Sequence, residues 1–300
     1  MPLYQMQDNE QLYVREIGQG EPVLVLSGLG MQSWQWLPFI ALHLKNFKFI
    51  IPDWRGFGGS KNCAIPEIDA ISSHWQDIQC LTDQLPYQRY HVIAYSMGAT
   101  TAMHGMKYGH FGDKIGHYLH IDQTPKIASD ASWEYGLLGQ RYTQFKALLD
   151  ELSQFLHQHQ NYQTLNQLPK QLSRELVELW IGFLSLQDNH QLTSKIFQKT
   201  LNQPKLQKII LPMQRLDYMR WYIDNYLNHQ EDYRDAVAHL KSPATFIIGS
   251  RSALYPAEGQ RIVAQSVPNS KSVIFNRSGH TPLINEPIKF AQEISNFLRN

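Results

Sequence analysis

A serine in the first third of the chain has the surroundings that nucleophilic catalysis requires. The stretch YHVIAYSMGATTAMHGMKYG reads as an apolar strand, a tight turn and a helix, and Ser96 lies in the turn. The pentapeptide AYSMG stands where a nucleophile elbow has G-x-S-x-G, a turn that exposes the serine hydroxyl at the end of a strand. The simpler reading is a serine that only caps the helix. The strand–turn–helix context favours Ser96 as an attacking nucleophile.

A second segment offers hydrogen-bond donors for the charge that such an attack creates. An apolar run ends in Gly28-Leu29-Gly30, and a glycine turn at this point leaves backbone N–H groups unpaired. Acyl transfer needs two donors aimed at the developing oxyanion. We expect them to be the amides of Leu29 and of Met97, the residue after the serine. An ordinary glycine turn is the alternative for this segment.

A histidine near the end of the chain is placed to serve as a general base. His280 follows the last predicted strand in VIFNRSGHTPLINEP, so it comes last in the order serine, acid, histidine. In this position it would take the serine proton during attack. The pair His157 and His159 suggests a metal site, but alternate positions on a helix diverge, so we do not expect one.

The elements that would position these groups alternate in type. Over residues 1–125, short apolar runs such as FKFIIP and YHVIA are separated by stretches with helical periodicity. This alternation predicts an α/β fold with a mostly parallel central sheet flanked by helices. Residues 126–240 have helical periodicity and few β-branched runs, and strand patterns resume over residues 241–300. We therefore expect one core in two parts, 1–125 and 241–300, with 126–240 inserted as a helical lid.

Composition narrows the class of protein. The 300 residues are 43% hydrophobic and 18% charged, which is ordinary for a globular protein. The formal net charge of +1 gives no electrostatic case for nucleic acid. No stretch approaches the roughly 18 apolar residues of a membrane-spanning helix, and the first 20 residues lack the features of a signal peptide. With two cysteines and no metal-like spacing, we expect a soluble, cytoplasmic protein.

Taken together, these motifs resemble those of the α/β-hydrolase superfamily over nearly the whole chain apart from the predicted lid. DWRGFGGS is similar to the D-x-R-G-x-G-x-S segment of its esterase, lactonase and perhydrolase branches, and the resemblance implies that Arg55 is structural. The segment from Gly28 to Trp34 resembles the family's H-G-x-G…W stretch, with Ser27 where histidine is usual. The resemblance implies hydrolysis by a serine–histidine–acid triad, with no metal or organic cofactor.

The acid of that triad is the point at which the chain departs from the family. FIIGSRSALYP aligns with the usual G-x-x-D-x-x-x-P segment, and Ser252 occupies the position of the aspartate. Family members without this aspartate can carry the acid at the end of the strand before the lid, where this chain has Asp122. We expect Asp122 to orient His280 and Ser252 to contribute little. A mere turn cap is the alternative for Asp122, and Glu258 is the second choice of acid.

Large apolar side chains are frequent in the predicted lid, and most would form its own interior. Some would line an apolar pocket above the serine, for which our candidates are Trp34, Tyr95, Trp133 and Trp221. The lid also carries a run of positive charge in which Asp217 is the single acidic residue: Lys195, Lys199, Lys205, Lys208, Arg215 and Arg220. Such a run is usually a solvated surface, and it would also suit an acidic carrier protein or a carboxylate substrate.

The sequence therefore predicts a serine hydrolase that cleaves a carboxylic ester, lactone or thioester through an acyl-enzyme. The substrate would be a small-molecule ester, or an acyl chain on an acidic carrier protein. A serine nucleophile argues against haloalkane dehalogenases and epoxide hydrolases, which need a carboxylate there. Two alternatives stay open: C–C bond hydrolysis or cofactor-free oxygenation on the same residues, as in the quinaldine dioxygenases, and a ligand-sensing relative that signals through its lid.

Overall fold

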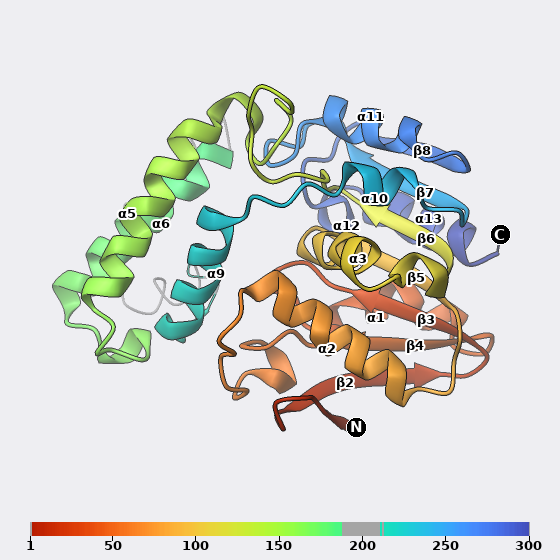
Figure 1. Cartoon of the computed structure of the whole chain (residues 1–300), viewed down its shortest axis with the longest axis horizontal. Helices are drawn as coiled ribbons and strands as arrows, with labels where there is room; N and C mark the ends of the chain where they lie inside the picture. The colour runs from red at the N-terminus through yellow and green to blue at the C-terminus, as the bar shows by residue number, and fades with distance from the viewer. Residues whose placement is uncertain (1, 188–210, 212, 300) are drawn as a thin grey trace.

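The computed structural model describes residues 2–187, 211 and 213–299. Within them the chain forms an eight-stranded sheet in the order β1-β2-β4-β3-β5-β6-β7-β8 (Figure 1). Strand β2 pairs antiparallel with β1 and β4, and every other pair is parallel. The strands are β1 (Leu3–Gln5), β2 (Gln11–Gly18), β3 (Glu21–Leu26), β4 (Phe47–Pro52), β5 (Tyr90–Tyr95), β6 (Ile115–Ile121), β7 (Ala244–Gly249) and β8 (Ser270–Phe275). The predicted α/β class with a mostly parallel sheet is confirmed.

Helices cover both faces of the sheet, which explains why its central strands are apolar on both sides. One face packs against α1 (Leu37–Ile40) and α13 (Pro287–Arg299), with Trp36, Phe290 and Ile294 in the shared core. The other face packs mainly against α2 (Ala70–Gln84), α3 (Met97–Tyr108), α10 (Arg234–Ala238) and α11 (Ala257–Ser266). Two single-turn helices, α4 (Phe111–Lys114) and α12 (Pro282–Asn285), complete the described core.

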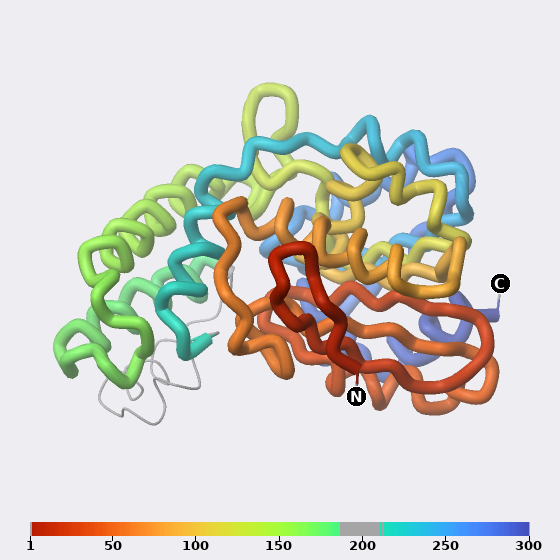
Figure 2. The backbone as a smooth tube through the Cα atoms, turned by 60° about the horizontal axis from the view of Figure 1, so that its bottom comes forward, coloured from red at the N-terminus to blue at the C-terminus, as the bar shows by residue number. Residues whose placement is uncertain are grey.

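Three further helices lie beside the sheet rather than on it. They are α5 (Tyr142–Gln158), α6 (Lys170–Gln187) and α9 (Leu216–Asn228), and both views show them to one side of the core (Figures 1 and 2). Helix α5 packs against α6 and α9. In the part of 126–240 that the structure describes, no segment adds a strand to the sheet. Helix α10 also falls in this range, but it packs on α3 and α11 with the core helices.

Helix α9 is fixed to the core by hydrogen bonds from side chains to backbone carbonyl groups. The Tyr218 hydroxyl donates to the carbonyl of Cys63 at 2.8 Å, and the Tyr222 hydroxyl donates to that of Arg55 at 3.0 Å. These carbonyl groups belong to irregular segments, so the tyrosines satisfy acceptors that the sheet leaves free. Helix α9 is thus held in a fixed position between the core and α5.

Candidate active site

The carboxyl ends of the central parallel strands meet at one edge of the sheet, where ligands bind in open α/β folds. Ser96 follows β5, and Asp122 follows the neighbouring strand β6. Gly28 lies in the loop after β3, on the other side of β5. His280 comes from the loop between β8 and α12. The sheet order therefore brings residues from four distant parts of the sequence to one place.

Ser96 lies in a strained turn. Its backbone has φ 52° and ψ −121°, a conformation that residues with side chains rarely adopt and that clusters at functional sites. The turn is tight because Gly98 lies against β3: a Cβ atom there would be 2.1 Å from the carbonyl oxygen of Leu26. Strand β5 thus passes directly into α3 and leaves the serine side chain at the cavity end of the strand. The strand–turn–helix context predicted around Ser96 is confirmed.

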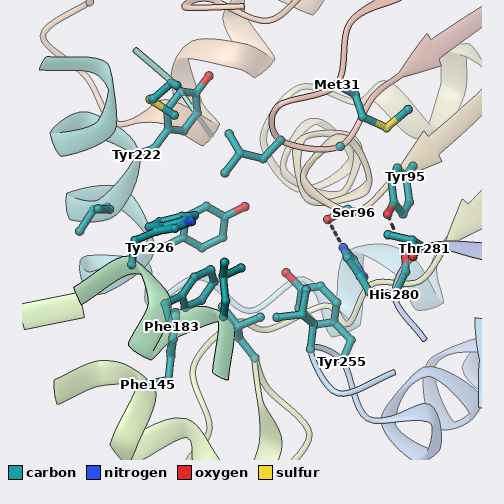
Figure 3. Close-up of a pocket in the computed structure, with 18 of the residues that line it drawn as sticks. Met31, Tyr95, Ser96, Phe145, Phe183, Tyr222, Tyr226, Tyr255, His280 and Thr281 are labelled. Atoms are coloured by element: carbon teal, nitrogen blue, oxygen red, sulfur yellow. Dashed lines mark hydrogen bonds between the residues drawn. The ribbon is translucent and has the colours of Figure 1, made fainter. Parts of the chain in front are cut away.

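Hydrogen bonds join the serine, the histidine and the aspartate in one line. The imidazole Nε2 of His280 lies 2.9 Å from Ser96 Oγ (Figure 3), and its Nδ1 lies 2.7 Å from Asp122 Oδ2. A carboxylate only accepts, so Nδ1 carries the proton and Nε2 is free to accept from the serine hydroxyl. The structure therefore brings the three selected residues together. Glu258, the second choice of acid, instead pairs with Arg261 at 3.0 Å near the surface.

The carboxylate of Asp122 is fully buried and surrounded by donors. Its Oδ1 accepts from the amide of Gly249 and from Gln260 Nε2, each at 3.0 Å. Its Oδ2 accepts from the Ser252 hydroxyl at 2.7 Å, in addition to the His280 ring. These contacts compensate the cost of removing a carboxylate from water. Gln260 is a contact that the sequence did not indicate, because nothing in its helix shows which residue turns towards the sheet edge.

Two tyrosines hold the imidazole from either side. The hydroxyl of Tyr95 donates to the backbone carbonyl of His280 at 2.8 Å, and its ring stacks on the imidazole with centroids 5.3 Å apart. The ring of Tyr255 lies 5.4 Å from the imidazole (Figure 3). Burial raises the pKa of both phenols far above the ordinary range, so both stay neutral. Tyr255 was not identified from the sequence.

The two backbone amides predicted to hold an oxyanion, those of Leu29 and Met97, lie in the segments that flank Ser96. Met97 is the first residue of α3, so its N–H has no acceptor within the helix. Leu29 lines the same cavity as Ser96, in the loop after β3. In the described part of the chain, neither amide donates to another backbone group. The residue before Leu29 has to be glycine, because a Cβ atom at Gly28 would be 2.9 Å from the ring of Tyr95.

A cavity of about 360 Å³ extends from the serine towards the inserted helices. Ser96 and His280 lie at one end, and Phe145, Phe183 and Tyr226 lie across the cavity from them (Figure 3). Its walls are mainly leucine, methionine and aromatic side chains from α5, α6, α9 and the loops at the sheet edge. None of the described residues that line it is Asp, Glu, Lys or Arg. The cavity therefore suits an uncharged, apolar group.

Of the four residues proposed for the pocket, only Tyr95 lines the cavity. Trp34 is 53% exposed, and its indole bonds to Gln32 at 3.2 Å. Trp133 lies in the turn after β6, where it packs against Gly259 of α11. The prediction was wrong for these tryptophans, because Trp34 is exposed to solvent and Trp133 is buried against α11 instead of above the serine.

Trp221 was also wrongly placed in the pocket. It belongs to α9, but its indole points towards the core and donates to the carbonyl of Ile68 at 2.9 Å. The neighbouring residue Tyr222 lines the cavity and has its hydroxyl 2.9 Å from the ring of His74. Trp221 therefore anchors α9 to the core outside the cavity, whereas Tyr222 both anchors the helix and lines the cavity.

Other charged and polar residues have structural partners. Arg55 is buried and pairs with Asp77 at 2.7 Å and with Asp8 at 2.5 Å, as expected for a residue that holds loops together. Ser27 accepts a hydrogen bond from the indole of Trp36 at 2.9 Å, which gives it a packing role where the family usually has histidine.

The predicted run of positive charge is mostly outside the described residues: Lys195, Lys199, Lys205 and Lys208 are not among them. Of the remainder, Arg215 pairs with Asp217 at 2.5 Å and donates to two backbone carbonyls. His157 pairs with Asp224 at 2.9 Å, and no group of three or more metal-ligating side chains occurs in the described part of the chain. No described helix is long and apolar enough to cross a membrane.

Comparison with known proteins places this chain in a family. Two curated relatives, both pimeloyl-[acyl-carrier protein] methyl ester esterases, are 24% identical to the chain. The protein from Vibrio vulnificus matches over 93% of this chain and 95% of its own length, and that from Legionella pneumophila over 96% and 99%.

Solved structures share the fold. An esterase from Exiguobacterium antarcticum superposes with a TM-score of 0.73 at 18% identity, covering 100% of this chain and 99% of its own. An enol-lactonase from Burkholderia xenovorans has a TM-score of 0.68 at 17% identity, with both chains fully covered. The profile of the alpha/beta hydrolase fold family matches residues 21–287. The chain belongs to the alpha/beta hydrolase fold family.

Proposed function

We propose that this ester hydrolase cleaves a small-alcohol ester of a long, uncharged acyl chain through an acyl-enzyme on Ser96. The observation that carries the proposal is the line of hydrogen bonds from Ser96 Oγ to His280 Nε2 and from His280 Nδ1 to Asp122 Oδ2, at 2.9 and 2.7 Å. A nucleophile, a base and a group that orients the base are the parts that acyl transfer requires.

In the first half of the reaction, Ser96 Oγ attacks the ester carbonyl carbon while His280 Nε2 takes the hydroxyl proton. The negative charge on the carbonyl oxygen is held by the amides of Leu29 and Met97, which supply the two donors such an intermediate needs. Asp122 stabilises the positive charge that His280 acquires. Collapse of the intermediate breaks the bond to the alcohol oxygen, and His280 returns the proton to the leaving alcohol.

In the second half, water takes the place of the alcohol. His280 removes a proton from the water, which attacks the acyl carbon bound to Ser96. The second intermediate forms against the same two amides, and its collapse releases the carboxylic acid and restores the serine hydroxyl. The cycle requires only groups of this chain and one water molecule.

The shape and lining of the cavity support an acyl chain as the group that is bound. The wall opposite Ser96 consists of apolar and aromatic side chains, including Phe145 and Phe183. The cavity also reaches Ile284, which is 68% exposed, so it opens to solvent beside α12. The relatives that act on pimeloyl-[acyl-carrier protein] methyl ester support a methyl ester at Ser96 and a carrier attached to the far end of the chain. The chain would leave through this opening.

Residues 126–240 are the proposed lid of this cavity. Helices α5, α6 and α9 supply most of the wall that faces the sheet edge. Helix α9 is bonded to the core, whereas α6 packs on α5, one layer further out. We therefore assign α9 to the fixed part of the lid and expect chain-length selectivity to depend on α5 and α6.

Labelling with a fluorophosphonate probe tests the nucleophile. The purified protein should be modified at Ser96, as located by peptide mass spectrometry, and should lose esterase activity in proportion to labelling. Ser96→Ala should remove both labelling and turnover of p-nitrophenyl esters. Thr100→Ala, a matched loss of a hydroxyl one turn further along α3, should keep both. Labelling that persists in Ser96→Ala would refute the assignment.

A further inference from the structure

Ser252 occupies the position of the aspartate in the G-x-x-D-x-x-x-P segment that this stretch resembles, and it contacts Asp122, the proposed acid. Its hydroxyl donates to Asp122 Oδ2 at 2.7 Å, the same oxygen that receives His280 Nδ1. The same Oγ accepts a hydrogen bond from the amide of Tyr255 at 3.3 Å. A serine at this position therefore links the acid to the loop whose tyrosine packs against the imidazole.

We propose that Ser252 is a positioning residue for catalysis, which acts by fixing the Asp122 oxygen that orients His280. The inference rests on the proposed function and adds a residue to it. It also replaces our expectation that Ser252 contributes little to catalysis. That expectation considered only whether a hydroxyl group could act as the acid in place of a carboxylate.

The arrangement of donors around Asp122 explains why one hydroxyl matters. Oδ1 has two fixed donors, the Gly249 amide and Gln260 Nε2. Among the described residues, Oδ2 has the Ser252 hydroxyl as its single donor besides the imidazole. Without Ser252, the imidazole of His280 alone would set the direction of Oδ2. The carboxylate could then not orient the imidazole independently. Hydrogen bonds to a charged group are also stronger than those between neutral groups, and burial of Asp122 strengthens them further.

The backbone conformation of Asp122 is a second reason why its carboxylate needs a fixed partner. Asp122 has φ 45°, a left-handed conformation that is uncommon for a residue other than glycine. Its position at the end of β6 is one strand away from β7, where the usual acid would follow. The side chain of Asp122 thus reaches the imidazole from the end of β6 instead of the end of β7. Ser252 supports this side chain on the side that faces β7.

The test compares steady-state kinetics of Ser252→Ala, Ser252→Thr and a control. Ser252→Ala should lower kcat about tenfold with little change in KM, since one hydrogen bond to a carboxylate is lost and the cavity is untouched. Ser252→Thr keeps the hydroxyl and should retain most of kcat. The control is Ser250→Ala, because Ser250 lies in the same loop and its hydroxyl donates to the carbonyl of Asn276, away from Asp122.

A double-mutant cycle separates positioning of the acid from support of the loop. In an Asp122→Asn background, Ser252→Ala should cause less than a twofold further loss, since the carboxylate it serves is gone. An equal loss in both backgrounds, or full kcat in Ser252→Ala, would overturn the inference. These outcomes leave the proposed function intact as long as Ser96→Ala is inactive, whereas an active Ser96→Ala would refute the proposed function itself.

Discussion

The hydroxyl of Tyr95 donates a hydrogen bond to the backbone carbonyl of His280, 185 positions further along the chain. The residue before the proposed nucleophile therefore holds the loop that carries the proposed base, His280. Strand β5 ends at Tyr95 and is paired on both sides, with β3 and β6. The bond from Tyr95 therefore holds the loop after β8 against a rigid part of the sheet.

Loss of this bond should loosen the base without changing the cavity. Tyr95→Phe keeps the ring that stacks on His280 but removes the donor, so we expect kcat to fall several-fold and the free energy of unfolding to fall by about 1 kcal/mol. Tyr90→Phe on the same strand is the control, since its hydroxyl makes a longer bond of 3.4 Å far from the site. Equal kcat for both variants would contradict the role given to Tyr95.

Removal of the acid should have a much larger effect. Asp122→Asn keeps the shape of the side chain but cannot stabilise the protonated imidazole, so kcat should drop by about 10³–10⁴, as for the corresponding change in a serine protease. Glu258→Gln, at the position of the rejected acid, should keep activity. The reverse pattern would show that the acid is misassigned.

A carboxylate at position 252 should also take over part of the role of Asp122. Ser252 Oγ lies 2.7 Å from the oxygen that contacts His280, so a carboxylate at position 252 starts close to the imidazole. We expect Asp122→Asn combined with Ser252→Asp to recover part of the kcat lost by Asp122→Asn alone. No recovery in a correctly folded double variant would mean that position 252 cannot reach the imidazole.

The lining of the cavity should discriminate against charge. None of its described residues is a cation that would pair with a carboxylate, and burying an unpaired carboxylate costs several kcal/mol. We therefore expect kcat/KM for dimethyl pimelate to exceed that for monomethyl pimelate by at least about 100-fold at pH 8. Methyl heptanoate, which has the same chain length and no second carboxyl group, should resemble the dimethyl ester. Equal values for the two pimelate esters would show that a cation reaches the bound chain.

The far wall of the cavity should set chain length. Phe183 lies across the cavity from Ser96 on α6, so Phe183→Ala should shift the preference among p-nitrophenyl esters by two or more carbons towards longer chains. Leu172→Ala removes a partly buried side chain from the same helix but not from the cavity, and should leave the preference unchanged. An unchanged preference in folded Phe183→Ala would contradict the assignment of the chain to this cavity.

Buried histidines should make the fold sensitive to acid. Burial lowers the pKa of His117 from the ordinary 6.5 to about 4, helped by the nearby His91 and Lys271. Below pH 6.5 the unfolded chain takes up a proton that the folded chain refuses, so stability is complete above pH 6.5 and is lost as the pH falls towards 4. His117→Phe should reduce the slope of unfolding free energy between pH 6 and 4.5 by up to about 1.4 kcal/mol per pH unit. Urea unfolding at several pH values measures the slope, and the exposed His239→Gln should leave it unchanged.

The sequence by itself determined the fold class and pointed to the candidate catalytic groups. Apolar runs such as FKFIIP are buried on both faces, and this pattern requires a parallel sheet with helices on either side. Ser96 was identified because the geometry of a strand–turn–helix is local: small residues on both sides of the serine are visible in a few consecutive positions. His280 was selected by its order in the chain, and Asp122 because members of the family that it resembles can carry the acid at the end of the strand before the lid.

Only the tertiary structure decided which side chains surround these groups. Trp221 and Tyr222 are neighbours on one amphipathic helix and both bond to the core, yet Tyr222 lines the cavity and Trp221 does not. Periodicity indicates which side of a helix is buried, but α9 is buried on two sides, against different partners. The contacts of Gln260 and Ser252 with the acid likewise depend on how α11 and its preceding loop pack at the edge of the sheet. Such contacts join residues more than 100 positions apart, so they are set by packing and leave no local signal in the sequence.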